Sequence, residues 1–283
     1  MCGRAYSSYS RGVAGSEKRI SVLTGHSAGL RITVFLVLAV VVGLIGSSLV
    51  GGTSLRVVVI GDSVAYDAEP GIREALGATE EASVETRSIG GVGLLRPGID
   101  EYLVDSVKGE PDVVVVMLGG WDLGEIVKDP SAYAKRLDEV AELLTSAGAY
   151  VIWLGMPPTP PDEGIEEARQ KANQLFVDLA GRHPLVDSIP TGPVIGAPTS
   201  GPDYGFVRFR PGVEGTRVQV RKVRNGRDDG HLCPGGAALL GSVVLDAVSE
   251  RFGLGAPADR WWEGSWTTDP RYDDPPGSCS VTP

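Results

Sequence analysis

Continuous apolar, β-branched runs constrain the fold of this chain most strongly. Residues 112 to 118 read DVVVVML, and comparable runs occupy residues 55–60 and 149–154. Strands without polar alternation are typical of parallel sheets covered by helices on both faces, because neither face of such a strand meets water. The runs therefore predict strands of a mainly parallel sheet.

Helical patterns separate these strand signals along the chain. Residues 130–147 carry apolar side chains at helical spacing and stop at Gly148. Further helices are expected over 69–76, 97–107, 162–180 and 235–252, and further short strands over 83–88 and 185–187. Strands that alternate with helices predict an α/β protein, a three-layer α/β/α sandwich with a mainly parallel five-stranded sheet over residues 55–252.

Two stretches fall outside this alternation. Residues 204–224 alternate in a β manner around Pro211-Gly212, which predicts an inserted antiparallel hairpin. Such an insertion could wall a substrate cleft or merely decorate the surface. The tail, residues 253–283, carries Trp and Tyr among Pro and Asp, so it either packs its aromatics onto the domain or extends as a linker.

The first 50 residues predict a membrane segment. Residues 32–50 are uncharged over 19 positions, enough for a helix to cross about 30 Å of hydrocarbon. Residues 1–31 form a basic leader that is expected to stay cytoplasmic. We therefore expect a single-pass anchor that places the remaining domain outside the cytoplasmic membrane. Secretion after signal cleavage is the alternative, although the leader is long and the cleavage site poor.

Charge and cysteines agree with that topology. The formal net charge is −10 despite the basic leader, which argues against partners such as nucleic acids or anionic lipids. Cys233 and Cys279 would both lie in an oxidising compartment, where a disulfide persists. We predict that they form a bridge that pins the tail next to His231, the alternative being two free thiols.

Two separated motifs together predict nucleophilic catalysis. Gly61-Asp62-Ser63 ends the first predicted strand, which places a hydroxyl at the carboxyl edge of the sheet. Asp228-Asp229-Gly230-His231 supplies an imidazole that can take the hydroxyl proton and a carboxylate that can orient the imidazole. Of the three histidines, only His231 has a carboxylate at useful spacing and a following Gly/Pro turn. The motifs therefore predict a split Ser, His, Asp triad.

With these motifs the chain resembles the SGNH (GDSL-type) hydrolases over about residues 55–252. The resemblance implies a flavodoxin-like fold, with Ser63 as nucleophile and His231 as general base. It favours Asp228, three residues before the histidine, as the orienting acid, with Asp229 as its rival. In the Gly-rich turn of residues 88–91, Gly91 would share the oxyanion hole with the amide of Ser63, and Gly90 is the next candidate.

A third motif departs from that family. Its pattern Gly, x, Asn, Asp stands here as Gly119-Gly120-Trp121-Asp122, and tryptophan cannot reproduce the amide donation of Asn from the same geometry. Loss of one oxyanion donor costs about 10² to 10³ in rate. We therefore expect an oxyanion hole of two backbone amides, at Ser63 and Gly91. The substrate pocket is expected to comprise Asp62, Gly90, Gly120, Trp121, Asp122 and Pro157.

The predicted anchor and the resemblance together indicate a membrane-anchored, extracytoplasmic serine esterase acting on O-acyl, chiefly acetyl, esters of cell-envelope carbohydrate. The divergent motif, the anchor and the tail also resemble extracytoplasmic SGNH domains associated with acyltransferases of bacterial surface polysaccharides, so an acyltransferase with the same triad is an alternative. A non-catalytic carbohydrate-binding domain is another, motivated by Trp121. The sequence contains no metal-binding cluster or nucleotide loop, and we expect no cofactor, no metal and no nucleic-acid partner. The expected ligand is a small acyl ester or an O-acylated glycan.

Overall fold

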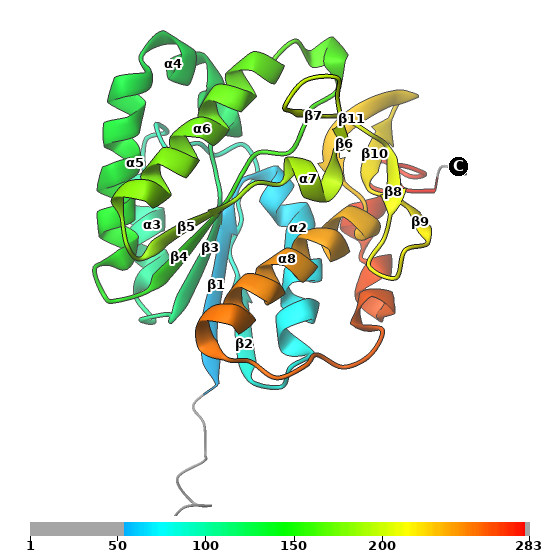
Figure 1. The fold of residues 1–283 in the computed structure, drawn as a ribbon, viewed down its shortest axis with the longest axis horizontal. Helices are drawn as coiled ribbons and strands as arrows, with labels where there is room; N and C mark the ends of the chain where they lie inside the picture. The colour runs from blue at the N-terminus through cyan, green and yellow to red at the C-terminus, as the bar shows by residue number, and fades with distance from the viewer. Residues whose placement is uncertain (1–53, 281–283) are drawn as a thin grey trace, which may run out of the picture. The chain divides into compact units, whose positions relative to one another are not determined.

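A five-stranded parallel sheet forms the centre of the computed structural model, which describes residues 54–280 (Figure 1). The strand order is β2-β1-β3-β4-β5, and every neighbouring pair is parallel. The strands are β1 (Leu55–Gly61), β2 (Ala82–Thr86), β3 (Val113–Met117), β4 (Tyr150–Leu154) and β5 (Val186–Ile189). The predicted α/β class and five-stranded sheet are confirmed.

Helices cover both faces of the sheet (Figure 1). One face carries α2 (Ser63–Gly77) and α8 (Pro234–Phe252), and the other carries α3 (Ile99–Val107), α4 (Leu123–Lys128), α5 (Pro130–Thr145) and α6 (Glu166–Arg182). Alternate residues of β1 enter different cores: Val57 and Val59 pack on the α2 and α8 side, whereas Val58 and Ile60 pack on the other. Both faces of β1, β3 and β4 are buried, which explains why the sequences of these three strands lack polar alternation.

Helix α2 begins six residues before the predicted start at residue 69. Asp62 caps it by accepting a hydrogen bond from the backbone N–H of Val64, at 2.9 Å. Pro70 lies inside the helix and has no N–H to donate to the carbonyl of Tyr66. The guanidinium of Arg271, from the tail, donates to that carbonyl instead. A contact across 205 residues of sequence therefore lets the helix continue through a proline.

Three short antiparallel pairs lie between β5 and α8. After the short helix α7 (Gly192–Ile195), β6 (Ala197–Pro198) pairs with β7 (Tyr204–Gly205), β8 (Phe209–Pro211) with β9 (Arg217–Gln219), and β10 (Arg221–Arg224) with β11 (Arg227–Leu232). The β8–β9 hairpin lies within the insertion predicted over 204–224. The β10–β11 hairpin was not predicted, and it makes the Asp228-to-His231 motif part of a strand rather than a turn.

The tail packs onto the domain. It forms short 3-10 helices, η3 (Trp261–Glu263), η4 (Ser265–Thr268) and η5 (Pro270–Asp273), all of which contact α2. Trp261, Trp266 and Tyr272 are buried in the core shared by α2 and α8. The predicted disulfide between Cys233 and Cys279 is present and ties the end of the tail to the start of α8.

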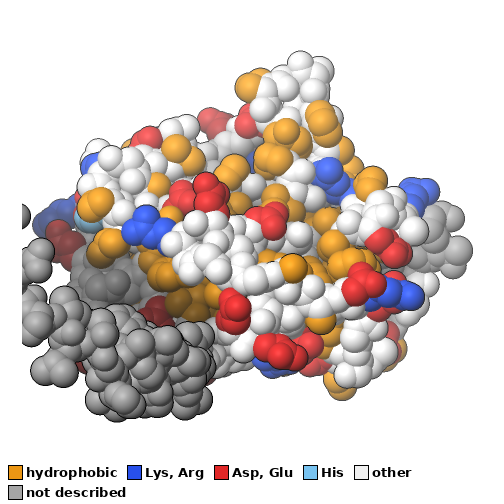
Figure 2. Space-filling view, turned by 60° about the horizontal axis from the view of Figure 1, so that its bottom comes forward, with side chains coloured by type: hydrophobic (Ala, Val, Ile, Leu, Met, Phe, Trp, Pro, Cys, Tyr) orange, Lys and Arg blue, Asp and Glu red, His pale blue; other side chains and the backbone are white. Residues whose placement is uncertain are grey.

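The surface in Figure 2 shows acidic side chains spread among basic and apolar ones rather than gathered in one patch. Within residues 54–280, no helix has the length and apolar character needed to cross a bilayer. The predicted leader, residues 1–31, and the predicted membrane segment, residues 32–50, lie outside the described part of the chain.

Candidate active site

Ser63 lies at the turn between β1 and α2. It is the first residue of the helix, directly after the capping residue Asp62. The turn requires Gly61, because a Cβ there would lie 2.2 Å from the Cβ of Ala65 and 2.5 Å from the carbonyl oxygen of Met117. The tight strand-to-helix turn therefore presents the Ser63 hydroxyl at the carboxyl edge of the sheet, as the sequence predicted.

His231 and a carboxylate complete a chain of three contacts. The Nε2 atom of His231 lies 2.9 Å from Oγ of Ser63, although the two residues are 168 positions apart. The other ring nitrogen, Nδ1, lies 2.7 Å from Oδ1 of Asp229, which also accepts the backbone N–H of His231 at 2.8 Å. The arrangement is that of a nucleophile, a base and an orienting acid.

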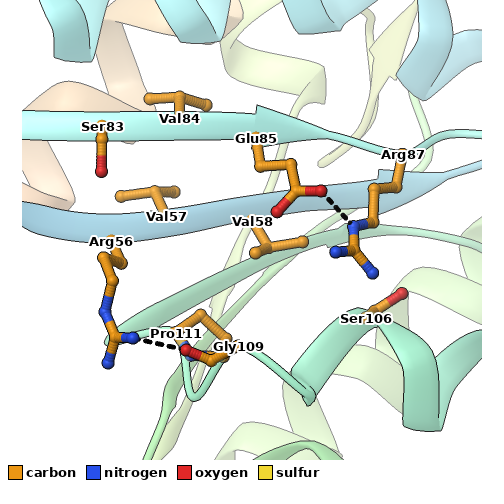
Figure 3. Close-up of a pocket in the computed structure, with 10 residues that line it drawn as sticks. All are labelled: Arg56, Val57, Val58, Ser83, Val84, Glu85, Arg87, Ser106, Gly109 and Pro111. Carbon is orange, nitrogen blue, oxygen red and sulfur yellow. Dashed lines mark hydrogen bonds and ion pairs between the residues drawn. The ribbon is translucent and has the colours of Figure 1, made fainter.

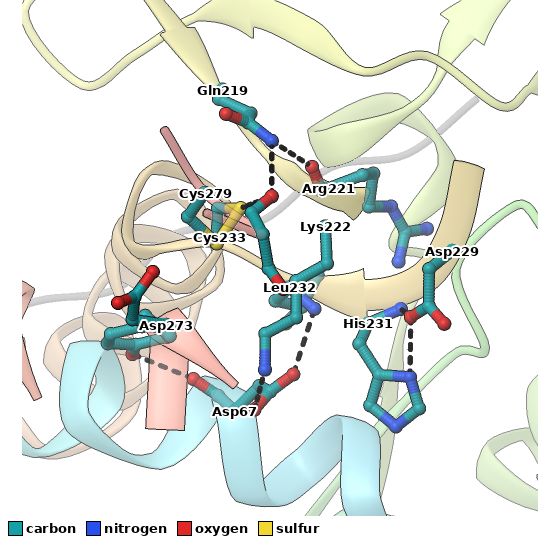
Figure 4. The surroundings of a disulfide bond; sticks show 12 residues. Asp67, Gln219, Arg221, Lys222, Asp229, His231, Leu232, Cys233, Asp273 and Cys279 are labelled. Carbon is teal, nitrogen blue, oxygen red and sulfur yellow. Dashed lines mark hydrogen bonds and ion pairs between the residues drawn. A yellow bond between two sulfur atoms is a disulfide. The ribbon is translucent and has the colours of Figure 1, made fainter. Parts of the chain in front are cut away.

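Asp229, and not the predicted Asp228, contacts the histidine (Figure 4). Both belong to β11, and successive side chains of a strand point to opposite faces, so Asp229 and His231 share a face that Asp228 does not. The carboxylate of Asp228 instead accepts a hydrogen bond from Nε of Arg208 at 2.8 Å. The structure thus corrects the prediction in favour of the rival residue.

The two aspartates at the site differ in their pKa. Burial disfavours ionisation of Asp229, but hydrogen bonds from the side chain and the backbone of His231 outweigh this effect and hold its pKa below the usual value. Burial raises the pKa of Asp62 to about 6, although the backbone N–H groups of Val64 and Ala65 partly offset the rise. Asp229 is therefore suited to stabilise a protonated imidazole.

A cavity of about 240 Å³ opens beside Ser63. Four predicted pocket residues line it: Asp62, Gly120, Trp121 and Pro157. Trp121 is 63% exposed, so its indole forms part of the rim. The other lining residues are Ser63, Val64, Met156, Thr159, Glu163, Ile165, Asp229, Gly230 and His231. Glu163 and Ile165 were missed, although both closely follow the proline-rich loop after β4, residues 156–161, which contains the predicted Pro157.

Asp122 does not line this cavity, which corrects its predicted role. It is buried, and its Oδ2 atom accepts the backbone N–H of Leu94 at 2.6 Å and the hydroxyl of Tyr133 at 3.0 Å. Gly93 packs so closely that a Cβ there would lie 2.4 Å from Oδ1 of Asp122. Asp122 therefore anchors the Gly-rich loop that follows β2.

That loop carries both predicted oxyanion glycines. A Cβ on Gly90 would lie 3.9 Å from the Cβ of Ser63, so Gly90 lies beside the nucleophile although it is not among the lining residues of the cavity. Gly91 has a φ of +75°, a conformation that favours glycine, and lies against the indole of Trp121. Donation by the Gly91 amide to an oxyanion stays a prediction.

Buried cations hold the proline-rich loop in place. Arg169 donates through Nη1 to the carbonyl of Met156 at 2.8 Å, and Arg221 donates through Nη2 to the carbonyl of Pro158 at 2.6 Å. Arg221 also donates to the carbonyl of Gly230, so it connects this loop to the strand that carries His231. Burial lowers the pKa of Arg221 to about 9. Its role was not predicted, since a single Arg in a polar strand gives no signal of burial.

A second cavity, of about 310 Å³, lies along β1 and β2 (Figure 3). Its arginines are already engaged: Arg56 donates to the carbonyl of Gly109, and Arg87 to Glu85 at 2.7 Å. No histidine is among its lining residues, and within residues 54–280 no three His, Cys, Asp or Glu side chains are grouped to hold a metal. The cavity at Ser63 is therefore the better candidate for catalysis.

A model of the family described as "Protein of unknown function (DUF459)" matches residues 56–247. The chain belongs to the DUF459 family, which is part of the SGNH superfamily. The matched range runs from β1 into α8, so it spans both Ser63 and His231. The resemblance to SGNH hydrolases that the motifs indicated is confirmed.

Solved structures similar to this DUF459 protein include a GDSL-like lipase from Bacteroides thetaiotaomicron. Its sequence identity to the chain is 15% and its TM-score is 0.48, and the match covers 74% of this chain and 96% of the lipase chain. A putative acylhydrolase from Bacteroides fragilis is similar at 16% identity and a TM-score of 0.46, with 70% and 88% covered. An acetylxylan esterase from Geobacillus stearothermophilus, in a mutant form, is similar at 14% identity and a TM-score of 0.38, with 46% and 74% covered. At these identities the likeness carries no information on substrate. No curated protein shows significant sequence similarity to the chain.

Proposed function

We propose that this DUF459 protein is a serine ester hydrolase that acts on short O-acyl, chiefly acetyl, esters of carbohydrate. The observation that carries the proposal is the contact chain of Ser63, His231 and Asp229, with distances of 2.9 and 2.7 Å. A hydroxyl within hydrogen-bond reach of an imidazole, itself oriented by a carboxylate, is the arrangement that activates a serine.

The reaction proceeds in two steps. Oγ of Ser63 attacks the ester carbonyl carbon while Nε2 of His231 takes the hydroxyl proton, and His231 then gives that proton to the departing alcohol oxygen. Water attacks the resulting acyl-enzyme, His231 takes its proton, and the proton returns to Oγ as the carboxylic acid leaves. Asp229 accepts a hydrogen bond from Nδ1 and stabilises the imidazolium during both steps.

The negative charge on the tetrahedral oxygen needs donors other than the missing Asn. The backbone amides of Ser63 and Gly91 fill this role in our proposal. The amide of Ser63 belongs to the first turn of α2, where unpaired N–H groups and the helix dipole favour negative charge. Asp122 contributes indirectly, because it holds the loop that carries Gly91.

The size and lining of the cavity support a short acyl group on a neutral sugar. Its volume of about 240 Å³ lies below the roughly 300 to 1,000 Å³ of pockets that bury drug-sized ligands. The carboxylates of Asp62 and Glu163 line it and disfavour anionic acyl groups. The exposed indole of Trp121 offers a flat apolar face on which the C–H face of a sugar ring can pack.

Hydrolysis of p-nitrophenyl acetate and of an acetylated oligosaccharide by the full-length chain tests the proposal. Ser63→Ala and His231→Ala should abolish turnover above background. Asp229→Asn should lower kcat by up to about 10⁴-fold, the loss seen when a triad acid is neutralised. Asp228→Asn is the matched control, with a rate within a few-fold of the wild type. Equal rates for the wild type and Ser63→Ala would refute the proposal.

The same triad supports an acyltransferase, in which a sugar hydroxyl replaces water in the second step. An added oligosaccharide acceptor would then gain an acyl group at the expense of free acid, which mass spectrometry detects. A non-catalytic carbohydrate-binding domain is distinguished by a fluorophosphonate probe, which labels an activated serine. Glycan binding without labelling of Ser63 would favour the binding domain.

We further propose that the enzyme works outside the cytoplasmic membrane, anchored by residues 32–50, on acylated carbohydrate of the cell envelope. The Cys233–Cys279 disulfide supports this location, because disulfides persist in oxidising compartments. Protease treatment of intact cells tests it: digestion of the catalytic domain supports an external location, and full protection contradicts it.

A further inference from the structure

Asp67 and Lys222 form a buried ion pair close to the catalytic residues. Each residue is 2% exposed, and Nζ of Lys222 lies 3.0 Å from Oδ1 of Asp67. Neither residue lines the cavity at Ser63, so neither is placed to touch a substrate. Burying two charges costs free energy that their attraction seldom recovers in full, so stability alone is a poor reason for the pair.

The second oxygen of Asp67 contacts the strand that carries the catalytic histidine. Oδ2 accepts the backbone N–H of Leu232, the residue after His231, at 3.0 Å (Figure 4). Asp67 belongs to α2, one helical turn after Ser63. Two contacts therefore bridge α2 and β11 side by side: Ser63 with His231, and Asp67 with Leu232.

We propose that Asp67, held by Lys222, is a positioning residue that keeps His231 against Ser63. The inference rests on the proposed esterase function. Because the nucleophile and Asp67 belong to the same helix, the Asp67–Leu232 hydrogen bond sets how far β11 lies from that helix. With β11 fixed at this distance, the imidazole of His231 stays within hydrogen-bond reach of Oγ of Ser63.

Lys222 controls the orientation of the Asp67 carboxylate. It belongs to β10, the strand that pairs with β11, and its Nζ also donates to the backbone carbonyl of Arg271 at 2.7 Å. The hydroxyl of Tyr272 donates to the backbone carbonyl of Asp67 at 2.8 Å. The tail thus contacts both members of the pair and restricts the position of each.

The charge of Lys222 also keeps Asp67 a good acceptor. Burial raises the pKa of Asp67, and the charge of Lys222 acts against that rise. Without the cation, the carboxyl group would gain a proton more readily and hold Leu232 less strongly. Loss of either partner should therefore loosen the same hydrogen bond.

Steady-state kinetics of the full-length chain test the inference with Asp67→Leu, which removes the acceptor of the Leu232 N–H at similar side-chain size, with Lys222→Met and with the double variant. Rates on p-nitrophenyl acetate are measured at a temperature where each variant is folded by circular dichroism. We expect kcat to fall by about 10- to 100-fold, the scale of a misplaced catalytic group, with KM changed by no more than about twofold. The double variant should be no worse than the worse single variant, because the two residues act as one unit.

Leu144→Ala is the matched control for lost stability. Leu144 is fully buried in the core on the other face of the sheet, and its truncation lowers the stability of the domain without touching β11. Its kcat should equal that of the wild type. The inference is overturned if Leu144→Ala loses as much kcat as the pair variants, or if all the pair variants keep the wild-type kcat.

Two arrangements keep the test decisive. A single variant that leaves an unpaired buried charge could fail to fold. In that case the kcat of the double variant, which has neither charge, is compared with the kcat of the wild type and of Leu144→Ala. Ser63→Ala in the same assay separates the two proposals. Activity that survives Ser63→Ala defeats the proposed function, whereas a serine-dependent rate that is unchanged in the folded pair variants defeats only the positioning role.

Discussion

At the scale of single residues, four aspartates near the site show how surroundings assign different roles to one side chain. Asp229 binds His231, Asp228 binds Arg208, and Asp122 holds a loop from a buried position. Asp62 caps α2 while it lines the cavity, and burial raises its pKa to about 6. Their sequence neighbours do not distinguish these roles, since each of the four lies within two residues of a glycine in a short motif.

Asp62 predicts a measurable dependence of stability on pH. Its folded pKa of about 6 exceeds the value of about 3.9 expected in an unfolded chain, so ionisation is disfavoured in the folded state. Its contribution to stability is then greatest below pH about 4 and is lost as the pH rises to about 6. Asp62→Asn keeps the capping oxygen and should be more stable than the wild type by roughly 2 to 3 kcal/mol at pH 8, but not at pH 4.

Urea unfolding of the wild type and of Asp62→Asn at both pH values measures that difference. The free energy of unfolding should converge between the two proteins at the lower pH. A difference that is the same at pH 4 and pH 8 would show that ionisation of Asp62 has no such cost.

At the scale of elements, the site depends on how a strand and two loops are held. The pairing of β10 with β11 keeps the His231 motif extended, so that Asp229 faces the imidazole. Arg169 and Arg221 hold the proline-rich loop, and Asp122 holds the Gly-rich loop. Each loop follows a strand of the sheet, and side-chain contacts from later elements fix both.

Asp122→Ala tests whether the carboxylate of Asp122 fixes the position of the Gly-rich loop. The change leaves the buried N–H of Leu94 and the hydroxyl of Tyr133 without their acceptor, which should lower the free energy of unfolding by roughly 2 to 3 kcal/mol. It should also lower kcat, because the loop carries the proposed oxyanion donor Gly91. Asp122→Asn, which keeps an acceptor oxygen, should lose less of both in denaturation and rate measurements. Wild-type stability in Asp122→Ala would contradict this role.

At the scale of the whole described domain, the tail packs against α2 and completes the core on that side of the sheet. Trp261, Trp266 and Tyr272 fill the core beside α2 and α8, and Arg271 supplies the donor that Pro70 lacks. The disulfide then joins the end of the tail to Cys233, two residues after His231. Residues 261–279 are therefore part of the support for the catalytic helix and strand.

The disulfide should contribute strongly to stability. It closes a loop with a sequence separation of 46, for which chain entropy predicts roughly 4 kcal/mol. Reduction of the wild type should lower the guanidinium midpoint, and the variant Cys233→Ala with Cys279→Ala should match the reduced protein. Reductant should not affect this variant, which keeps only Cys2. An unchanged midpoint on reduction of the wild type would contradict the prediction.

The sequence by itself determined the class of fold, most of the strands and helices, the Ser63 turn, His231 and the disulfide. The strands, helices and turn depend on local patterns: uninterrupted β-branched runs indicate burial on both faces, and Gly61 before the nucleophile indicates a tight turn. The disulfide was predicted because Cys233 and Cys279 are the two cysteines that follow the predicted membrane segment. The tertiary structure alone decided which aspartate orients His231, how α2 passes through Pro70, and that Asp67 meets Lys222. These outcomes depend on strand pairing and on partners up to 205 residues away, and a local pattern carries no information about which distant group becomes a neighbour.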